Sequence, residues 1–197
     1  MKKALIVLDV QKIYTDEDSD FYCEGSEITV NNINKLIQKT TEKGDSIYLI
    51  KHIHKEDGSD LGRLFDFTGE AEEDFDFKEG TLEVEYDQNL IIPENKKEII
   101  KNRYSAFTKT NLENILKENE IQRVIICGFM TNFCCESTAR DALDRDFYVD
   151  FVIDATGTPG TENYDQDKIR EFVSELLAEG FARVMTTEEL LALLEEE

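Results

Sequence analysis

The sequence predicts an α/β fold in which one parallel sheet is covered by helices on both faces. Apolar runs of strand length alternate along the 197 residues with segments of helical period, which is the β-α-β order of a parallel sheet. Runs such as 5–8 and 124–127 are apolar at every position, and such runs are typical of strands buried on both faces. A sheet of this kind carries its ligand crevice at the carboxyl ends of the strands.

Six segments are candidate strands and five are candidate helices. The strands are expected at 4–10, 46–53, 98–101, 123–128, 148–154 and 181–185. The helical period predicts helices at 28–43, 111–119, 133–143, 165–178 and 187–194. The pattern does not determine the order of the strands in the sheet. The length fits one domain and no repeat or linker interrupts it, so residues 1–197 are expected to form a single domain.

The charge balance is strongly acidic and bears on the choice of partner. The chain has 22 Lys and Arg against 44 Asp and Glu, a formal net charge of −22. Such a field repels phosphate backbones and anionic lipids, which argues against nucleic-acid and membrane partners and leaves a small-molecule substrate. The apolar run 4–8 is interrupted by Asp9 and is too short to span a membrane, so we expect a cytoplasmic protein whose four cysteines are free thiols.

Two charged side chains directly follow apolar strand runs. Asp9 comes after 5–8 and Lys101 after 99–100, so both are expected at the carboxyl edge of the sheet. A half-buried carboxylate there needs a partner or a function, and a lysine beside it is kept charged. The alternative for Lys101 is a side chain that simply reaches solvent at the end of its strand.

The third candidate is a cysteine in the segment 128–136. A buried strand ends at Gly128 and a helix begins near residue 132 or 133. A cysteine in the first turn of that helix has free backbone N–H groups and the positive end of the helix dipole around it, which favours thiolate and can stabilise an oxyanion. Cys134 and Cys135 both lie in this turn and point about 100° apart, so these local features do not separate them. Cys23 and Cys127 are expected to be core residues.

The roles of two histidines and of one long segment stay open. His52 and His54 end the second strand and are expected to point to opposite faces. They fit a general base or a ligand, or one buried and one surface imidazole. The segment 57–88 is rich in Asp, Glu, Gly and Phe and is too long for an ordinary connection. It fits a lid, a substrate loop, an oligomer contact or a solvated loop.

Four motifs in chain order resemble those of the isochorismatase-like cysteine hydrolases. They are ALIVLDVQ at 4–11, KNRYSAF at 101–107, GFMTNFC at 128–134 and DAT at 154–156. The resemblance extends from Ala4 to about Met185. This family includes nicotinamidases, N-carbamoylsarcosine amidases and ureidoacrylate amidohydrolases. The resemblance implies a three-layer α/β/α, Rossmann-like fold around a six-stranded parallel sheet, and a homodimer or homotetramer.

The resemblance also implies the roles of the catalytic residues. Its motif selects Cys134 over Cys135 as the nucleophile, with Asp9 as the base that takes the thiol proton and Lys101 stabilising the charges. A thioester would form on the cysteine and be hydrolysed by water.

By the same resemblance, the backbone N–H groups of Met130 and Cys134 form the oxyanion hole, with a cis peptide bond between Phe129 and Met130. A substrate pocket is expected between polar and aromatic side chains. These are Gln11, Tyr14, Tyr104, Phe107 and Asn132.

The chain departs from the nicotinamidase pattern at the metal. Nicotinamidases carry a metal site near the second strand, built from Asp-x-His and further histidines. This chain has His52-Ile53-His54 at the matching place and no later histidine. Losing the carboxylate and the remaining imidazoles removes most ligands of such a site, so we expect no metal and no cofactor, and nicotinamide is disfavoured.

These observations predict a cysteine-dependent amidohydrolase that cleaves a small amide or ureido substrate. Isochorismatases proper, which cleave a vinyl ether, lack the cysteine nucleophile, so Cys134 favours the amidase. The alternatives are an isochorismatase-type ether or ester hydrolase, a catalytically idle binding or redox-sensing protein of the same fold, and an acidic scaffold protein.

Overall fold

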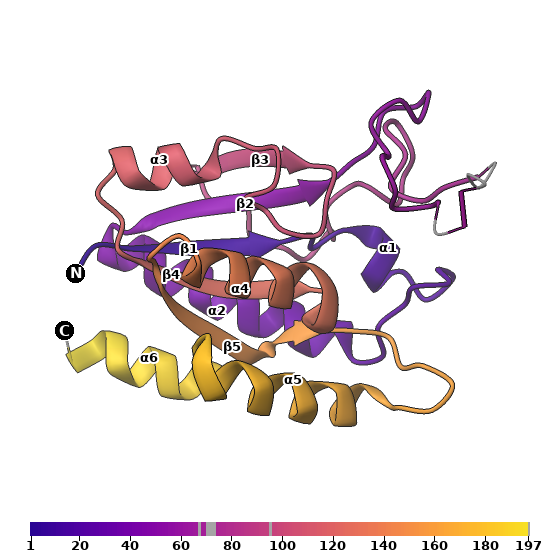
Figure 1. The fold of residues 1–197 in the computed structure, drawn as a ribbon. Helices are drawn as coiled ribbons and strands as arrows, with labels where there is room; N and C mark the ends of the chain where they lie inside the picture. Colours follow the sequence, from indigo (N-terminus) through magenta and orange to yellow (C-terminus); the bar gives the residue numbers. More distant parts are fainter. Residues whose placement is uncertain (67, 70–73, 95, 197) are drawn as a thin grey trace.

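A six-stranded parallel sheet forms the centre of the computed structural model, which describes residues 1–66, 68–69, 74–94 and 96–196 (Figure 1). The strands are β1 (Lys3–Leu8), β2 (Ser46–His52), β3 (Lys97–Lys101), β4 (Arg123–Phe129), β5 (Tyr148–Gly157) and β6 (Arg183–Met185). Each neighbouring pair is parallel, which confirms the predicted sheet.

The order of the strands creates a crevice in the middle of the sheet. They lie in the order β3-β2-β1-β4-β5-β6. The chain therefore starts at the centre, proceeds outward to β3, and returns to place β4 on the other side of β1. The loop after β1 leads to one face of the sheet, and the loop after β4 leads to the other face. The place where two neighbouring loops diverge in this way is a topological switch point, and ligands bind there in open α/β sheets.

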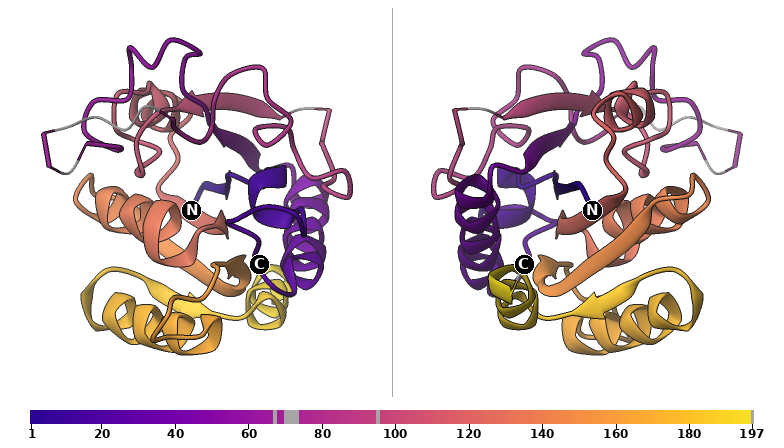
Figure 2. Two further views of the ribbon diagram at one scale, coloured as in Figure 1. Left: turned by 90° about the vertical axis from the view of Figure 1, so that its right-hand side faces the viewer. Right: turned by 90° about the vertical axis from the view of Figure 1, so that its left-hand side faces the viewer.

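Helices cover both faces of the sheet, as the resemblance implied. The helices are α1 (Lys12–Thr15), α2 (Ser26–Lys43), α3 (Leu112–Glu118), the π-helix η1 (Thr131–Cys135), α4 (Glu136–Leu143), α5 (Gln166–Gly180) and α6 (Thr187–Glu196). The apolar sides of α2 and α6 pack on one face, and those of α3, α4 and α5 pack on the other (Figure 2). None of the described helices is long and apolar enough to cross a membrane.

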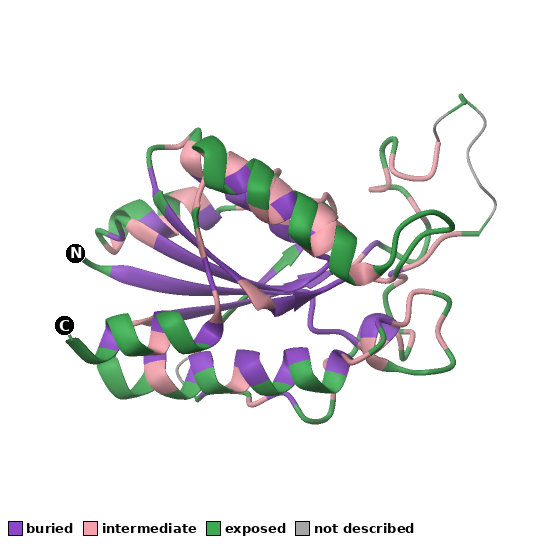
Figure 3. Ribbon diagram, turned by 90° about the horizontal axis from the view of Figure 1, so that it is seen from below, coloured by how far each residue is buried: buried purple, intermediate pink, exposed green. Residues whose placement is uncertain are grey.

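The continuous apolar runs are explained by two separate cores. Side chains alternate along a strand, so Leu5 and Val7 join the core beneath α2 while Ile6 and Leu8 join the core beneath α4. Burial therefore extends along the strands, whereas the helices are buried only in stripes (Figure 3). The sequence predicted this arrangement from runs without polar interruption.

Gly128 allows β4 to approach β1 closely at the crevice. Its φ is +124°, and a Cβ at this position would overlap the backbone of Leu8. Only glycine tolerates both conditions. The pairing of β4 with β5 shifts register between Ile126 and Gly128, and β5 continues to Gly157, beyond the predicted end at Asp154.

Asp150 holds the amino ends of three strands together and should contribute strongly to stability. Its buried carboxylate accepts hydrogen bonds from Arg123 at 2.9 Å and from Arg183 at 3.0 and 2.9 Å. We expect Asp150→Ala to lower the free energy of unfolding in urea by about 3 kcal/mol, because two arginines lose their partner. Asp18→Ala, at an exposed carboxylate, should change it by less than about 0.5 kcal/mol. A similar small loss for both variants would contradict this role.

Candidate active site

Three reactive side chains meet at the carboxyl edge of the sheet, at the switch point between β1 and β4. Lys101 Nζ lies 2.7 Å from Asp9 Oδ2 and donates a hydrogen bond to Cys134 Sγ at 3.2 Å. All three side chains are buried, with Asp9 fully inaccessible to solvent. The structure thus brings together the three residues that the sequence singled out from separate strand ends, and their catalytic roles stay a prediction.

Asp9 is positioned by a tight turn directly after β1. Its backbone N–H donates to the carbonyl of Ile50 at 3.0 Å, and its own carbonyl accepts from Gln11 at 2.7 Å. The φ of 51° lies in the left-handed region, where Asp and Asn are tolerated better than most residues. The turn therefore directs the carboxylate into the crevice.

Lys101 reaches the site from an edge strand. β2 lies between β3 and β1, and neighbouring strands are about 4.8 Å apart, so the side chain must cross about 10 Å. A four-carbon stem can span most of that distance, and shorter side chains cannot. The sequence placed Lys101 at a strand end, and the sheet order explains why the residue there is a lysine.

The π-helix η1 separates Cys134 from its neighbour. The carbonyl of Met130 accepts from the N–H groups of Phe133 at 3.2 Å and Cys135 at 3.1 Å. Cys134 lines the crevice, whereas Cys135 packs in the core beneath α4. The bond between Phe129 and Met130 is cis, as the resemblance implied. Met130 lines the same cavity, and the oxyanion-hole role of the Met130 and Cys134 N–H groups stays a prediction.

Burial dominates the protonation of the site. It raises the pKa of the Cys134 thiol to about 12, against the lowering effect of Lys101. Burial therefore opposes the preference for thiolate that the helix start was expected to give, and Cys134 needs a base to lose its proton. Burial also raises the pKa of Asp9, against the lowering effect of Lys101, which makes that carboxylate a stronger proton acceptor. Burial alone would lower the pKa of Lys101, but Asp9 and Cys134 raise it, so the ammonium stays charged.

A largely apolar cavity of about 340 Å³ opens onto Cys134. Tyr14, Tyr104 and Asn132 line it, as the sequence predicted. The remaining lining residues are Phe21, His52, Leu64, Phe65, Phe77, Met130, Phe133, Pro159, Gly160 and Thr161. Three of these, Leu64, Phe65 and Phe77, belong to the segment 57–88, so its described residues supply part of the cavity wall and are not merely a solvated loop. Residues 67 and 70–73 of the segment lie outside the part of the chain that the structure describes.

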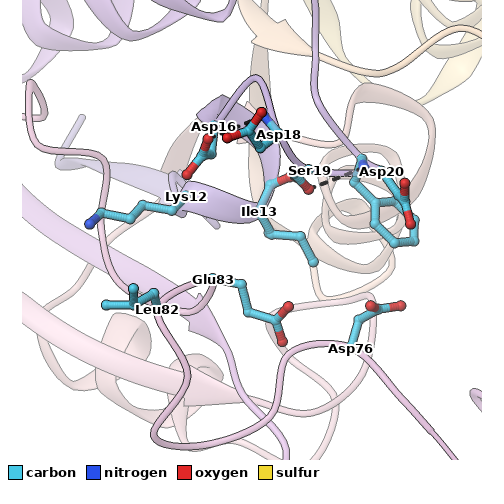
Figure 4. A pocket seen from close by; sticks show the side chains of 10 residues that line it. Lys12, Ile13, Asp16, Asp18, Ser19, Asp20, Asp76, Leu82 and Glu83 are labelled. Atoms are coloured by element: carbon cyan, nitrogen blue, oxygen red, sulfur yellow. Dashed lines mark hydrogen bonds between the residues drawn. The ribbon is translucent and has the colours of Figure 1, made fainter.

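A second hollow, of about 270 Å³, lies beside α1 (Figure 4). Acidic side chains surround it, among them Asp16, Asp18, Asp76 and Glu83. Phe21 lines both hollows, so this acidic surface adjoins the cavity of Cys134. Its negative potential disfavours the approach of anionic substrates.

Known proteins are similar to this chain in both sequence and fold. The family model of the isochorismatase domain matches residues 3–189. The chain belongs to the isochorismatase family. It is 32% identical over 197 residues to the isochorismatase family protein YrdC of Bacillus subtilis, covering 96% of this chain and 95% of YrdC. It is 30% identical over 190 residues to nicotinamidase 3 of Arabidopsis thaliana, covering 95% of this chain and 86% of that protein.

The structural comparison agrees with this assignment. A cysteine hydrolase from Pseudomonas syringae pv. phaseolicola has the same fold with a TM-score of 0.91 and 26% sequence identity, covering 99% of this chain and 93% of the other. The isochorismatase family and these relatives are hydrolases, and the protein is accordingly a hydrolase.

Two predicted pocket residues lie elsewhere in this isochorismatase fold. Gln11 is fully buried: its amide donates to the carbonyls of His52 at 3.0 Å and Val84 at 3.1 Å, and it accepts from the His52 N–H at 2.8 Å. It therefore joins β2 to the segment 57–88 and has no free polar atom for a ligand. Phe107 packs in the core beneath α3, stacked with Phe147 at a centroid distance of 6.0 Å. Its position after β3 directs it away from the cavity.

The two histidines are not one buried and one surface imidazole, and a role as general base or ligand stays a prediction. Their Nε2 atoms lie 3.1 Å apart, and both imidazoles are buried. β2 ends at His52, so His54 lies outside the strand and the alternation of side chains no longer applies. His52 also lines the cavity, and one of its ring nitrogens lies within 4.8 Å of Cys134 Sγ and of a carboxylate oxygen of Asp9. The sequence placed both histidines at the end of the second strand but did not predict that their side chains lie against each other.

These donors do not fit a nicotinamidase-type metal ion. Around Asp9 and Cys134 the ammonium of Lys101 already supplies the positive charge, in contact with both ligand atoms. The two imidazoles offer one facing nitrogen each, and the nearby Asp60 contacts the opposite nitrogen of His54. Zinc sites use three or four protein ligands around one centre. The expectation of a metal-free site rests on this donor set and stays a prediction.

The raised thiol pKa gives a testable pH dependence. We expect the rate at which iodoacetamide alkylates Cys134 to rise about tenfold per pH unit from pH 7 to 9 without a plateau, because the thiolate fraction grows until pH approaches a pKa of about 12. Site-resolved tandem mass spectrometry of the Cys135→Ala variant distinguishes alkylation of Cys134 from alkylation of Cys23 and Cys127. An unstructured cysteine peptide, whose pKa is about 8.5, should begin to level off in the same range. A plateau near pH 7 for Cys134 would show a thiolate instead.

Proposed function

We propose that this isochorismatase-family hydrolase is a cysteine amidohydrolase that cleaves a small, uncharged amide or ureido compound through a thioester on Cys134. The observation that carries the proposal is the contact of Lys101 with both Asp9 and Cys134 in a water-poor crevice. A buried acid and thiol that share one lysine serve nucleophilic attack on a carbonyl. Packing of the core alone does not explain these side chains, because burying charged groups is unfavourable.

The chemistry follows from the protonation of the site. Asp9 takes the proton from the Cys134 thiol, and the resulting thiolate attacks the substrate carbonyl. The negative oxygen that develops would lie against the N–H groups of Met130 and Cys134, which supply stabilisation without reorganisation. The protonated Asp9 then gives its proton to the departing nitrogen, so ammonia or an amine leaves and a thioester remains.

Hydrolysis of the thioester reverses the same proton transfers. Asp9, again ionised, accepts a proton from water as the water attacks the thioester carbonyl, and the thiol of Cys134 leaves with that proton. The product is a carboxylic acid, or a carbamic acid when the substrate is a ureido compound. Lys101 stays charged throughout, because both neighbours raise its pKa.

The cavity supports a small and uncharged substrate. Its volume of about 340 Å³ is at the lower end of the range for small-molecule sites. Its walls are rich in aromatic side chains, and the adjoining hollow is acidic. The name of the relative nicotinamidase 3 also indicates an amide substrate for that protein. An ether hydrolase of the same family is the second candidate, but a nucleophilic thiol has no evident use in it.

The nucleophile can be tested by measuring ammonia release from a panel of small amides and ureido compounds. We expect Cys134→Ala to lower turnover of any accepted substrate by at least about a thousandfold, because the thioester cannot form. Cys135→Ala is the matched control at the adjacent core residue and should keep most of the activity. Equal ammonia release by wild type and Cys134→Ala would remove Cys134 from the mechanism, and no release from any compound of the panel would favour the ether hydrolase.

The base can be tested separately. Asp9→Asn should lower kcat by about 10²- to 10⁴-fold, because the amide cannot accept the thiol proton. Asparagine tolerates the positive φ at this position, so the turn should be preserved. Asp16→Asn, in the exposed acidic hollow, serves as the control and should leave kcat unchanged. Retention of full activity by Asp9→Asn would remove this carboxylate from the mechanism.

A further inference from the structure

A chain of polar side chains leads from the partly exposed Asp60 to the cavity, and the proposed chemistry does not use it. Asp60 Oδ1 lies 3.4 Å from His54 Nδ1, and His54 Nε2 lies 3.1 Å from His52 Nε2. His52 is 2% exposed and lines the cavity beside Cys134. Its remaining ring nitrogen, Nδ1, is buried and has no hydrogen-bond partner among the described residues.

Asp60 is held as an anion at the outer end of the chain. Its carboxylate accepts from the Asn102 amide at 3.1 Å and from the backbone N–H of Lys55 at 3.1 Å. Burial would raise the pKa of Asp60, but these hydrogen bonds and His54 lower it. At 3.4 Å the carboxylate acts on His54 mainly through its charge, and that charge favours a proton on the facing Nδ1 of His54.

The position of that proton determines the rest of the chain. A neutral His54 with its proton on Nδ1 has a bare Nε2, which can only accept a hydrogen bond. His52 must then donate from its own Nε2, and its Nδ1 is left as an acceptor. Burial, followed by the charge of Lys101, lowers the pKa of His52 well below its usual value, so this imidazole is neutral.

The surroundings hold the His52 ring in this orientation. The ring stacks on Phe77, with centroids 4.5 Å apart and an angle of 14° between the planes. The backbone N–H and carbonyl of His52 are both bonded to Gln11. A rigid, buried acceptor in the wall of a mostly apolar cavity is a typical device for orienting a ligand that carries a donor.

We infer that the chain Asp60–His54–His52 selects the substrate by presenting His52 Nδ1 as a hydrogen-bond acceptor for a substrate N–H group near the carbonyl that Cys134 attacks. The inference rests on the proposed function for that carbonyl. The preferred substrates are primary carboxamides and ureido compounds, which carry N–H groups next to the carbonyl. Esters and fully N-alkylated amides lack the donor, and carboxylates would place a second acceptor against the lone pair of Nδ1.

The state of the chain can be measured without turnover. The protein has only two histidines, so long-range ¹H–¹⁵N correlation spectra contain two imidazole patterns. We expect the wild type at pH 7 to show a proton on Nε2 of His52 and on Nδ1 of His54. In Asp60→Asn, which has the same shape but no charge, the His54 preference should be lost. A proton on Nδ1 of His52 in the wild type would overturn the inference.

The acceptor role can be tested on Cys134→Ala, which cannot form a thioester. Urea and tetramethylurea share the carbonyl, but only urea has N–H groups. Urea should shift the ¹⁵N resonance of His52 Nδ1, and tetramethylurea should not. Equal shifts, or none with urea at concentrations that perturb other cavity residues, would overturn the inference. If the selective shift occurs while the wild type releases no ammonia from any amide, the amidase proposal fails and the acceptor assignment stands.

Discussion

The contact between Lys101, Asp9 and Cys134 is the constraint on which the rest of the site depends. An isolated charge is strongly unfavourable in a buried crevice, so the ammonium and the carboxylate are stable there only as a pair. The contact of all three side chains requires the ends of β1, β3 and β4 to be within reach of one another, and that follows from the strand order. The low polarity of the same crevice raises the pKa of the Cys134 thiol and of the Asp9 carboxyl, as the proposed proton transfer between them requires.

A second consequence of this crevice is that each polar group around it needs a defined partner. Gln11 uses its whole amide on the backbone of His52 and Val84, and Asp60 is held by Asn102 and the N–H of Lys55. These contacts fix the segment 57–88 against the sheet. The segment in turn supplies aromatic walls to the cavity, so the stability of the loop and the shape of the site are connected.

Prediction from the sequence succeeded where a local signal sufficed. Apolar runs located the six strands, and polar residues directly after them located Asp9 and Lys101. It was wrong where the outcome depended on neighbours. Gln11 and Phe107 belong to the same sequence motifs as Asp9 and Lys101, but one bonds to β2 and the other packs beneath α3. The sequence indicated that the start of the helix favours thiolate, but it could not show the complete burial that raises the pKa of the Cys134 thiol.

The sequence by itself determined the fold class, the family and the three residues at the strand ends, because periodicity and motif order are local properties of the chain. The tertiary structure decided which strand lies between β1 and β3, hence how far Lys101 must reach, and how the π-helix η1 places Cys134 at the crevice and Cys135 in the core. It also decided that His52 and His54 meet, since β2 ends between them. Such contacts depend on strand order and on the exact end of a strand, and both are set by long-range packing.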